Sequence, residues 1–217
     1  MNGERMRALQ AKGYRIGAQK TGLPHDLYRP TSALQPLAAA NKLLSLPVAW
    51  KPASPGDSFK GANLYGKPTW YGYFDFTLTK VGDYLVRQED QATWFVVAQQ
   101  HLLQPAAVDC NAVISITRPG QANEGFGAVG YGNADPGRPV ITGWPCSMLA
   151  GTKGEKSDDG LPRDTRNPWY AILLPALPGI EIRTDDKVSD ARGYNYEVSS
   201  AELTDLGWRL SVMFTGT

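Results

Sequence analysis

The chain has 217 residues, 42% of them hydrophobic, and is long enough to bury a core without help from disulfides or metal ions. Its 22 Lys and Arg residues balance 21 Asp and Glu residues, which argues against nucleic-acid partners and against a polybasic membrane anchor. No apolar run is long enough to span a bilayer, and no apolar stretch follows the first basic residues as in a secretory signal. We therefore expect a chain that folds in a cytoplasm.

Glycine and proline, with 23 and 16 residues, make up about 18% of the chain, against a usual share of about 12%. Both residues interrupt helices, whereas the abundant Tyr, Trp and Phe favour strands. The composition therefore predicts a mainly β fold of small antiparallel β-barrel or β-sandwich modules, with a long irregular N-terminal arm.

The first 48 residues are predicted to form that arm. Residues 4–12 can form two helical turns that end at Gly13, and residues 37–46 can form a second short helix. Closely spaced prolines exclude a long helix between residues 17 and 57: Pro24, Pro30, Pro36, Pro47, Pro52 and Pro55. The same stretch is rich in Leu, which a disordered tail would lack. We therefore predict an arm ordered by its own β-domain or by a neighbouring subunit, and the candidate partner contacts are Leu27, Tyr28, Arg29, Pro30, Leu34 and Leu37.

A first β-module is expected over residues 49–119. Residues 69–79 alternate and are rich in aromatic side chains, which is typical of a strand. Residues 83–86 and 93–98 are two β-prone runs separated by a polar turn, and they predict a hairpin. A further strand is expected over residues 108–117.

Residues 120–168 are predicted to be Gly-rich and charged loops, and the short piece 140–149 within them could be a strand or a turn. A second β-module is expected over residues 169–217. Its strands are expected at residues 169–174, 180–184, 186–188, 194–198 and 208–214.

One pattern occurs in both modules. Asp83 opens a strand, a polar turn follows, and an aromatic-led strand returns at Trp94; Asp186 and Tyr194 repeat this order. Two ordinary hairpins would give this repeated pattern, and so would two related β-modules.

Two glycine-rich motifs lack the context of a nucleotide site. Residues 125–130 match the letters of a dinucleotide-binding loop, but the residues after them cannot start a helix. Residues 61–68 resemble a phosphate-binding loop, but Pro68 stands where a hydroxyl ligand of Mg²⁺ is required. We therefore expect no cofactor.

Candidates for catalysis are few. The two histidines are His25 and His101, and the two cysteines are Cys110 and Cys146, so a cysteine-dependent hydrolase would need a thiol and an imidazole to meet in space. Two free buried thiols are expected in a reducing compartment, with a disulfide after release as the alternative. Neither pair of adjacent aspartates has the alternating spacing of a calcium site, and two Cys without nearby His cannot complete a zinc site. We assign no catalytic, cofactor-binding or metal-binding residue.

Three regions of the chain resemble structural proteins of tailed-bacteriophage virions. The matching residues are Asp26-Leu-Tyr-Arg-Pro30 in the arm, Gly82-Asp-Tyr-Leu-Val, Thr93-Trp-Phe-Val-Val-Ala-Gln and Cys110-Asn-Ala-Val-Ile-Ser-Ile-Thr-Arg-Pro119 in the middle, and Asp186-Lys-Val-Ser-Asp, Tyr196-Glu-Val-Ser-Ser and Leu206-Gly-Trp-Arg-Leu210 at the end. The last pattern is similar to small β-barrel joining proteins near phage connectors and tails.

The resemblance implies a non-enzymatic virion subunit of the tail or baseplate, or of the head–tail connector, that is made in the cytoplasm of a bacterial host. The expected partners are other virion proteins and copies of the chain in a symmetric ring, reached through residues 14–56 and the β-hairpins. Two other classes stay open. One is a glycan- or receptor-binding module that uses the loops beside Trp144 and Trp169, and the other is the cysteine-dependent hydrolase.

Overall fold

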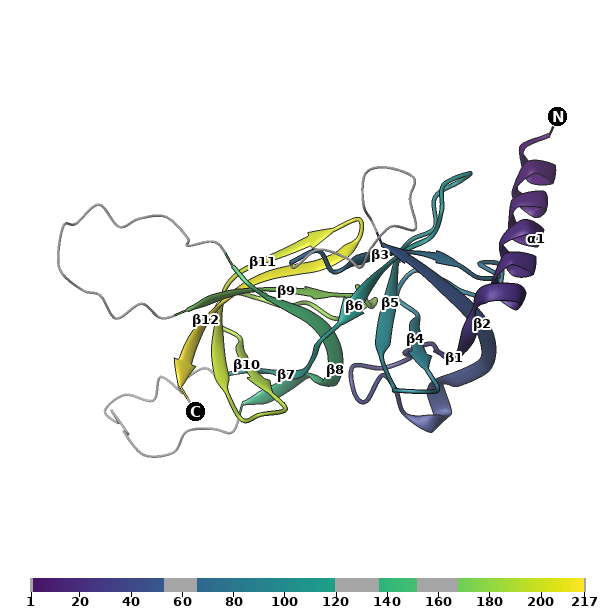
Figure 1. The fold of residues 1–217 in the computed structure, drawn as a ribbon. Helices are drawn as coiled ribbons and strands as arrows, with labels where there is room; N and C mark the ends of the chain where they lie inside the picture. The colour runs from purple at the N-terminus through teal and green to yellow at the C-terminus, as the bar shows by residue number, and fades with distance from the viewer. Residues whose placement is uncertain (1, 53–65, 120–136, 152–167, 217) are drawn as a thin grey trace, which may run out of the picture.

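The computed structural model describes residues 2–52, 66–119, 137–151 and 168–216, and these residues are 52% strand and 13% helix. They form two six-stranded antiparallel barrels that lie side by side, with one helix at the far end of the first barrel (Figure 1). The prediction of a mainly β chain built from small antiparallel barrel modules is confirmed. The two glycine-rich motifs at 61–68 and 125–130 lie wholly or largely outside the described residues.

Helix α1 covers Gly3–Thr21 and does not end at Gly13 as predicted. The side chain of Asn2 caps its first turn by accepting a hydrogen bond from the backbone N–H of Glu4. Ala11 and Ala18 are buried where the helix packs on strands of the first barrel. This packing offsets the cost of a mid-helix glycine, which is about 1 kcal/mol.

The first barrel is built from the first six strands of the chain. They are β1 (Leu23–Tyr28), β2 (Lys42–Pro52), β3 (Thr69–Tyr73), β4 (Tyr84–Arg87), β5 (Thr93–Ala98) and β6 (Ala106–Cys110), hydrogen-bonded in the closed order β1-β2-β3-β6-β5-β4. The prediction that residues 1–48 form a separate arm is therefore wrong, because β1 and β2 are barrel strands and β2 crosses the expected boundary at residue 48. The short helix expected at 37–46 is also absent: a 3-10 turn at Ala39–Asn41 leads directly into β2.

The second barrel begins at Ala112, well before the residue 169 that the sequence indicated. Its strands are β7 (Ala112–Arg118), β8 (Arg138–Ala150), β9 (Trp169–Leu174), β10 (Lys187–Asp190), β11 (Asn195–Thr204) and β12 (Gly207–Gly216), in the closed order β7-β8-β9-β12-β11-β10. The undecided piece 140–149 is thus part of a strand, whereas the strand expected at 180–184 is irregular backbone in which Ile182 is buried.

The two barrels have the same strand order, because each strand of the first barrel has a counterpart six strands later at the same position in the second barrel. The pairing registers agree as well: Leu27 faces Leu85 between β1 and β4, and Ile116 faces Val188 between β7 and β10. The interior positions of the first barrel are Leu27, Leu46, Val48, Phe74, Leu85 and Val96, and their counterparts are Ile116, Trp144, Cys146, Leu174, Val188 and Val198. This agreement favours two related modules over two unrelated hairpins.

An ion pair with a buried carboxylate lies at the same point of each barrel. Arg29, directly after β1, donates from Nε and Nη2 to the two carboxylate oxygens of Asp83 at 2.8 and 2.7 Å. Arg118, at the end of β7, does the same to Asp186 at 2.8 and 2.9 Å. In both barrels the carboxylate also accepts a backbone N–H three residues upstream, from Lys80 or Arg183. We call each of these pairs a latch.

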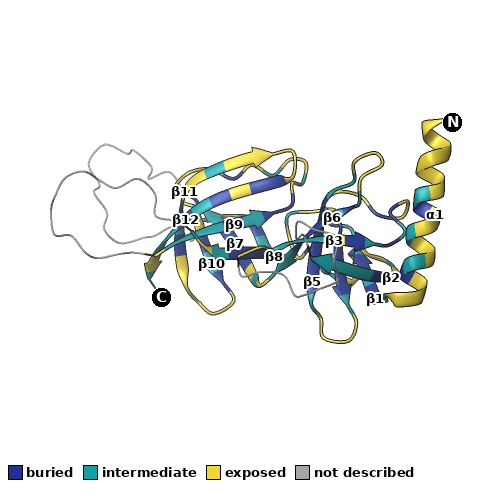
Figure 2. Ribbon diagram, turned by 45° about the horizontal axis from the view of Figure 1, so that its top comes forward, coloured by how far each residue is buried: buried dark blue, intermediate teal, exposed yellow. Residues whose placement is uncertain are grey.

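The barrels share one continuous core at their junction, where buried residues run from one barrel into the other (Figure 2). The hydroxyl of Tyr84 in β4 donates to the carbonyl of Pro145 in β8 at 2.8 Å, and its ring lies edge-on to Trp144. The indole N–H of Trp144 donates to the carbonyl of Ala33, in the segment between β1 and β2, at 2.7 Å. Between the barrels, Asn111 exchanges two hydrogen bonds with the backbone of Met148. The junction is therefore packed and hydrogen-bonded.

Candidate docking surfaces

The residues predicted to contact partners are mostly used inside the chain. Leu27 is fully buried in the first barrel, Pro30 is buried, and Arg29 forms a latch. Tyr28 and Leu37 are half-buried against the shared core. Among the six, only Leu34 presents an exposed side chain, and its backbone bridges to Thr142 in β8. Leu27 and Pro30 therefore have no free surface to offer to another chain.

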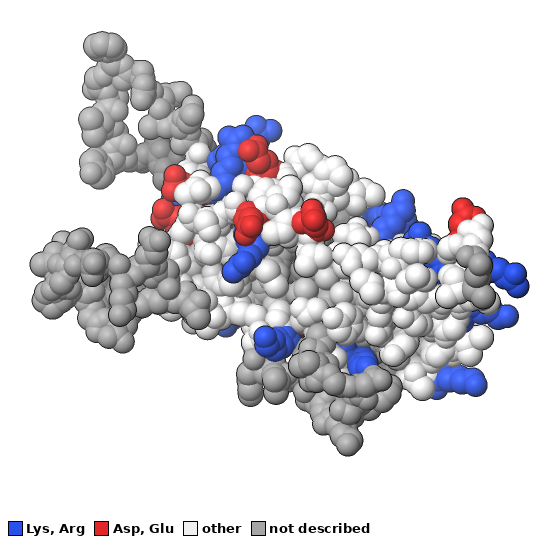
Figure 3. Space-filling view, turned by 90° about the horizontal axis from the view of Figure 1, so that it is seen from above, with Lys and Arg blue, Asp and Glu red and all other residues white. Residues whose placement is uncertain are grey.

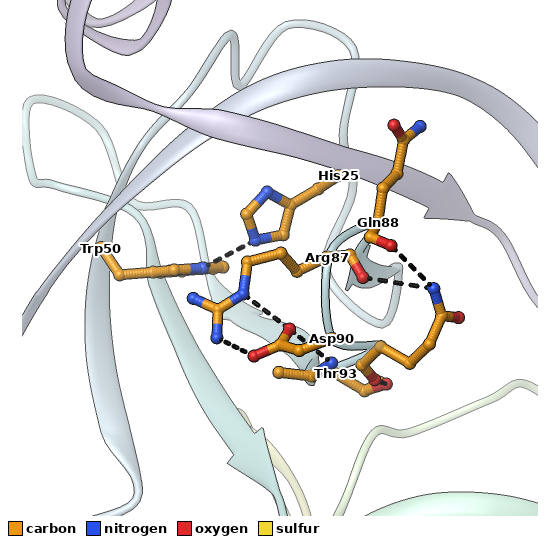
Figure 4. Close-up of polar contacts among 8 residues, drawn as sticks. His25, Trp50, Arg87, Gln88, Asp90 and Thr93 are labelled. Atoms are coloured by element: carbon orange, nitrogen blue, oxygen red, sulfur yellow. Dashed lines mark hydrogen bonds and ion pairs between the residues drawn. The ribbon is translucent and has the colours of Figure 1, made fainter.

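The strongest polar cluster in the first barrel surrounds His25 (Figure 4). The ring of His25 is fully buried, with Nδ1 2.8 Å from the carbonyl oxygen of Leu23 and Nε2 3.0 Å from the indole Nε1 of Trp50. The carbonyl must accept and the indole N–H must donate, so Nδ1 carries the proton. Trp94 stacks on Trp50 with ring centroids 4.9 Å apart, and the guanidinium of Arg87 lies over its ring at 5.2 Å. Both ring nitrogens of His25 are therefore paired, whereas the indole Nε1 of Trp94 is buried without a hydrogen-bond partner among the described residues.

The chemistry of the thiols gives no support to the cysteine-hydrolase alternative. Burial lowers the pKa of His25, and burial raises the pKa of both Cys110 and Cys146. A thiol with a raised pKa stays protonated near neutral pH and is a poor nucleophile. Both nitrogens of His25 are occupied, and the described residues include no hydrogen bond from either thiol to a histidine. Both cysteines are free thiols, as the sequence led us to expect.

The neutral, buried His25 predicts an acid-sensitive stability. Because its folded-state pKa lies below the ordinary value of 6.5, the unfolded chain binds more protons than the folded chain as the pH falls through 6.5. We expect the free energy of unfolding to decrease as the pH falls below 6.5, by at most about 1.4 kcal/mol per pH unit. Urea denaturation at several pH values measures this slope.

Two variants isolate the contribution of His25. His25→Ile introduces isoleucine, the residue at the equivalent position 114 of the second barrel. This variant should flatten the pH dependence of the free energy of unfolding. It should also lower the stability at pH 8 by about 1–3 kcal/mol, because the Trp50 indole N–H loses its acceptor. His101→Asn changes an exposed histidine and should keep the full slope. An unchanged slope in His25→Ile would show that another group controls the acid sensitivity.

The outward face of α1 is the first surface that the chain leaves without a partner. Residues spaced by three or four positions share one face of a helix, and here that spacing aligns Arg5, Leu9, Lys12, Ile16 and Lys20 opposite the buried Ala11 and Ala18. Leu9 and Ile16 are 53% and 41% exposed, and the nearby Met6 is 39% exposed. We call these six residues, Met6 included, the α1 stripe.

The α1 stripe is basic as well as apolar. The helix carries Arg and Lys at five positions and an acidic residue only at Glu4. Within the part of the chain that the structure describes, Arg5, Lys12 and Lys20 form no ion pair, whereas Arg15 reaches Asp75 at 3.8 Å. Lys and Arg side chains outnumber acidic ones at the end of the molecule that carries α1 (Figure 3). An exposed apolar face flanked by cations fits a partner surface that is both apolar and acidic.

The second unpartnered surface is a cleft of about 840 Å³ between the barrels. One wall is the outer face of β3, β5 and β6, and the other is the turn of the β11–β12 hairpin with the end of β9. Gly207 allows this hairpin to lie close to β9: at its φ of +124°, a Cβ atom would be 2.3 Å from the carbonyl oxygen of Leu174. Tyr71, Leu103 and Leu206 are exposed at its edges.

Other proposed sites find less support. Trp144 is 1% exposed and donates its indole N–H to Ala33, so it cannot stack on a sugar as the glycan-binding alternative required. Among the described residues, no three His, Cys, Asp or Glu side chains come together as metal ligands. Nor is any helix in the described ranges long and apolar enough to cross a bilayer. Comparisons of the chain with protein-family models, with curated proteins and with solved structures gave no match.

Proposed function

We propose that this chain is a non-enzymatic structural subunit of a larger assembly and that α1 docks it onto a neighbouring protein. The setting that the sequence resemblance implies is the tail or baseplate of a tailed-phage virion, with the head–tail connector as the alternative. The observation that carries the proposal is the α1 stripe, because three large aliphatic side chains are exposed on the helix beside cations that form no ion pair with any described residue. Exposed apolar patches rimmed by polar groups mark protein-contact sites.

The charge of the stripe indicates the chemistry of the neighbour. Pairing α1 with α1 of a second copy would bring Arg5, Lys12 and Lys20 against the same cations, and like charges in contact are unfavourable. A neighbour that presents carboxylates around an apolar groove would instead pair with both features of the stripe. We therefore propose a different protein, with an acidic and apolar groove, as the partner of α1.

The experiment must leave the barrels intact. Deleting the predicted arm, residues 1–48, would remove β1 and most of β2 and is expected to unfold the first barrel. Replacing Met6, Leu9 and Ile16 by Ser changes side chains that are already exposed, and it should shift the free energy of unfolding by less than about 1 kcal/mol in total. The variant is tested by complementing assembly of the particle from which the chain has been deleted.

We expect incorporation of this triple variant to fall at least tenfold, because hot-spot apolar contacts at an interface are each worth about 1–2 kcal/mol. Incorporation of the charge variant, Arg5→Glu with Lys12→Glu and Lys20→Glu, should fall by a similar factor. In the matched control, Ser replaces three side chains that are 49–50% exposed and lie outside α1: Leu43, Val81 and Leu102. This control variant should assemble normally. Normal incorporation of both α1 variants would refute the docking role.

A further inference from the structure

The contact between α1 and the first barrel is made mainly by small or polar side chains. The buried and half-buried residues of the helix are Gln10, Ala11, Tyr14, Gly17 and Ala18. Tyr14 is the large aromatic side chain in this set, and its ring lies edge-on to Tyr73 and Phe76 at centroid distances of 5.3 and 6.0 Å. The rest of the helix is exposed (Figure 2). The contact therefore buries little apolar area, which is the main source of stability in such packing.

Polar interactions do not make up for the small apolar contact. The amide Nε2 of Gln10 donates to the hydroxyl oxygen of Tyr14 at 3.1 Å and to the carbonyl of Leu103 at 3.4 Å, but Oε1 of Gln10 is buried without a partner among the described residues. A buried acceptor without a hydrogen bond opposes the burial of its side chain. Arg15 and Asp75 are 3.8 Å apart, and the Arg15 side chain is 53% exposed, so this ion pair contributes little.

The second barrel provides an internal comparison, because the chain enters both barrels in the same way. Gly22 links α1 to β1 and lies against the backbone of Val48 in β2. Asn111 links β6 to β7 and donates its backbone N–H to the carbonyl of Cys146, the counterpart of Val48 in β8. The first barrel thus contacts β8 as α1 contacts β2, but the side chains that it buries at the junction are large: Tyr84, Phe95, Val97 and Val108. The first barrel therefore holds α1 much more weakly than the two barrels hold each other.

The helix depends on this contact to stay folded. Isolated helices of a few turns are marginal in water even when they are rich in alanine, and α1 contains three glycines, Gly3, Gly13 and Gly17. A Cβ atom at position 13 or 17 would meet nothing within 4 Å, so packing does not require glycine there. Each glycine inside a helix disfavours the helix about fivefold relative to alanine. Release of α1 from the barrel and unfolding of α1 are therefore expected to occur as one step.

We propose that α1 is a detachable cap, which leaves the end of the first barrel and unfolds while both barrels stay folded. A segment with few buried apolar contacts opens at a lower free energy than the whole chain unfolds. Opening uncovers the rings of Tyr73 and Phe76, which now contact Tyr14, and it removes the guanidinium of Arg7 from its place 5.8 Å over the ring of Phe76.

Opening also regulates the α1 stripe, because the stripe exists only while α1 is helical. The opening equilibrium then sets the fraction of chains that can dock, and this consequence alone rests on the docking role proposed for α1. The opening itself is a property of the isolated chain. Measurements without a partner therefore test it separately from the assembly experiment.

Amide hydrogen exchange of the full chain, followed by NMR, measures the opening. We expect the amides of residues 7–21 to have protection factors at least about a hundredfold below those of β4 and β5. Arg118→Ala weakens the second barrel and should lower the protection of the barrel amides at least about tenfold, but it should leave α1 unchanged because the open state keeps both barrels folded. If α1 opened only when the whole chain unfolds, both sets of amides would lose protection equally.

Variants within α1 identify the step that controls exchange. Gly13→Ala with Gly17→Ala should raise the protection of α1 about twentyfold, the product of two fivefold gains in helix propensity. Tyr14→Ala should lower it about tenfold through loss of both aromatic contacts, whereas fraying of a docked helix would give a rise, since alanine favours helix. Lys12→Ala is the matched control at an exposed position and should change protection by less than about twofold.

Three results would each overturn the proposal. They are protection of α1 equal to that of β4 and β5, a loss of α1 protection in Arg118→Ala that matches the loss in the barrels, and a rise of α1 protection in Tyr14→Ala.

Discussion

Arg29→Ala and Arg118→Ala are each expected to lower the free energy of unfolding by about 3 kcal/mol. Each substitution removes the guanidinium from a carboxylate that is almost fully buried, since the side chains of Asp83 and Asp186 are 2% and 1% exposed. A buried carboxylate without its cation retains the cost of its desolvation. The arginine side chains are 31% exposed, so water can replace part of the lost interaction and the loss should fall at the low end of the range for buried pairs. Urea denaturation followed by tryptophan fluorescence measures the change.

Surface ion pairs of the same chain provide the control. Arg183 and Glu181 form a close pair at 2.6 Å, but their side chains are 58% and 64% exposed, so Arg183→Ala should leave the stability nearly unchanged. If the barrels are related modules, the two latch variants should cost similar amounts. A loss below about 1 kcal/mol for either of them would mean that the latch contributes little beyond its hydrogen bonds.

The β-hairpins could be predicted from the sequence because their signals are local. Asp83 and Asp186 open strands as expected, and alternation along the last strand buries Trp208, Leu210 and Val212. The first two strands were missed because prolines within them were interpreted as breaks. In the barrel, Pro24 and Pro47 lie opposite each other, and Pro24 lies just before the residues that pair with β4, so its missing N–H leaves that ladder complete.

The residues of both latches form a repeated pattern in the sequence, but the sequence alone does not show that they form ion pairs. Arg29-Pro30 and Arg118-Pro119 repeat one dipeptide, and Asp83 and Asp186 repeat one strand opening. The separations within the pairs are 54 and 68 residues, because the connecting loops differ in length. Only the shared strand order shows that the two arginines occupy equivalent places.

The docking surfaces were harder to predict, for two different physical reasons. The α1 stripe needs a helix that continues through Gly13, and local propensity alone ends it there. The cleft is assembled by tertiary packing from the outer face of one barrel and a hairpin of the other, so its two walls are separated by the 65 positions from Val108 to Leu173 in the chain. The residues predicted as partner contacts were chosen from a stretch that is rich in both leucine and proline, and strands β1 and β2 share this composition.

Trp144→Ala is expected to lower the free energy of unfolding by about 4 kcal/mol, the largest effect of a single substitution that we predict. Trp144 is 1% exposed, packs against Tyr84 of the other barrel, and pairs its indole with the backbone of the segment between β1 and β2. Its removal leaves a cavity in the shared core, and the carbonyl of Ala33 keeps only the hydrogen bond from the backbone N–H of Thr142. Equilibrium denaturation, with circular dichroism and fluorescence as independent probes, measures the loss.

The same experiment tests whether the barrels unfold together. Because one core joins them, the wild-type chain should show a single transition with coincident probes. Tyr84→Phe removes the hydroxyl that donates to Pro145 but keeps the ring, so it should cost about 1 kcal/mol and preserve the single transition. Trp144→Ala removes packing from the junction itself and is the variant most able to separate the transitions of the two barrels. Two transitions already present in the wild-type chain would mean that the junction couples the barrels weakly and that each barrel is stabilised mainly by its own interior and latch.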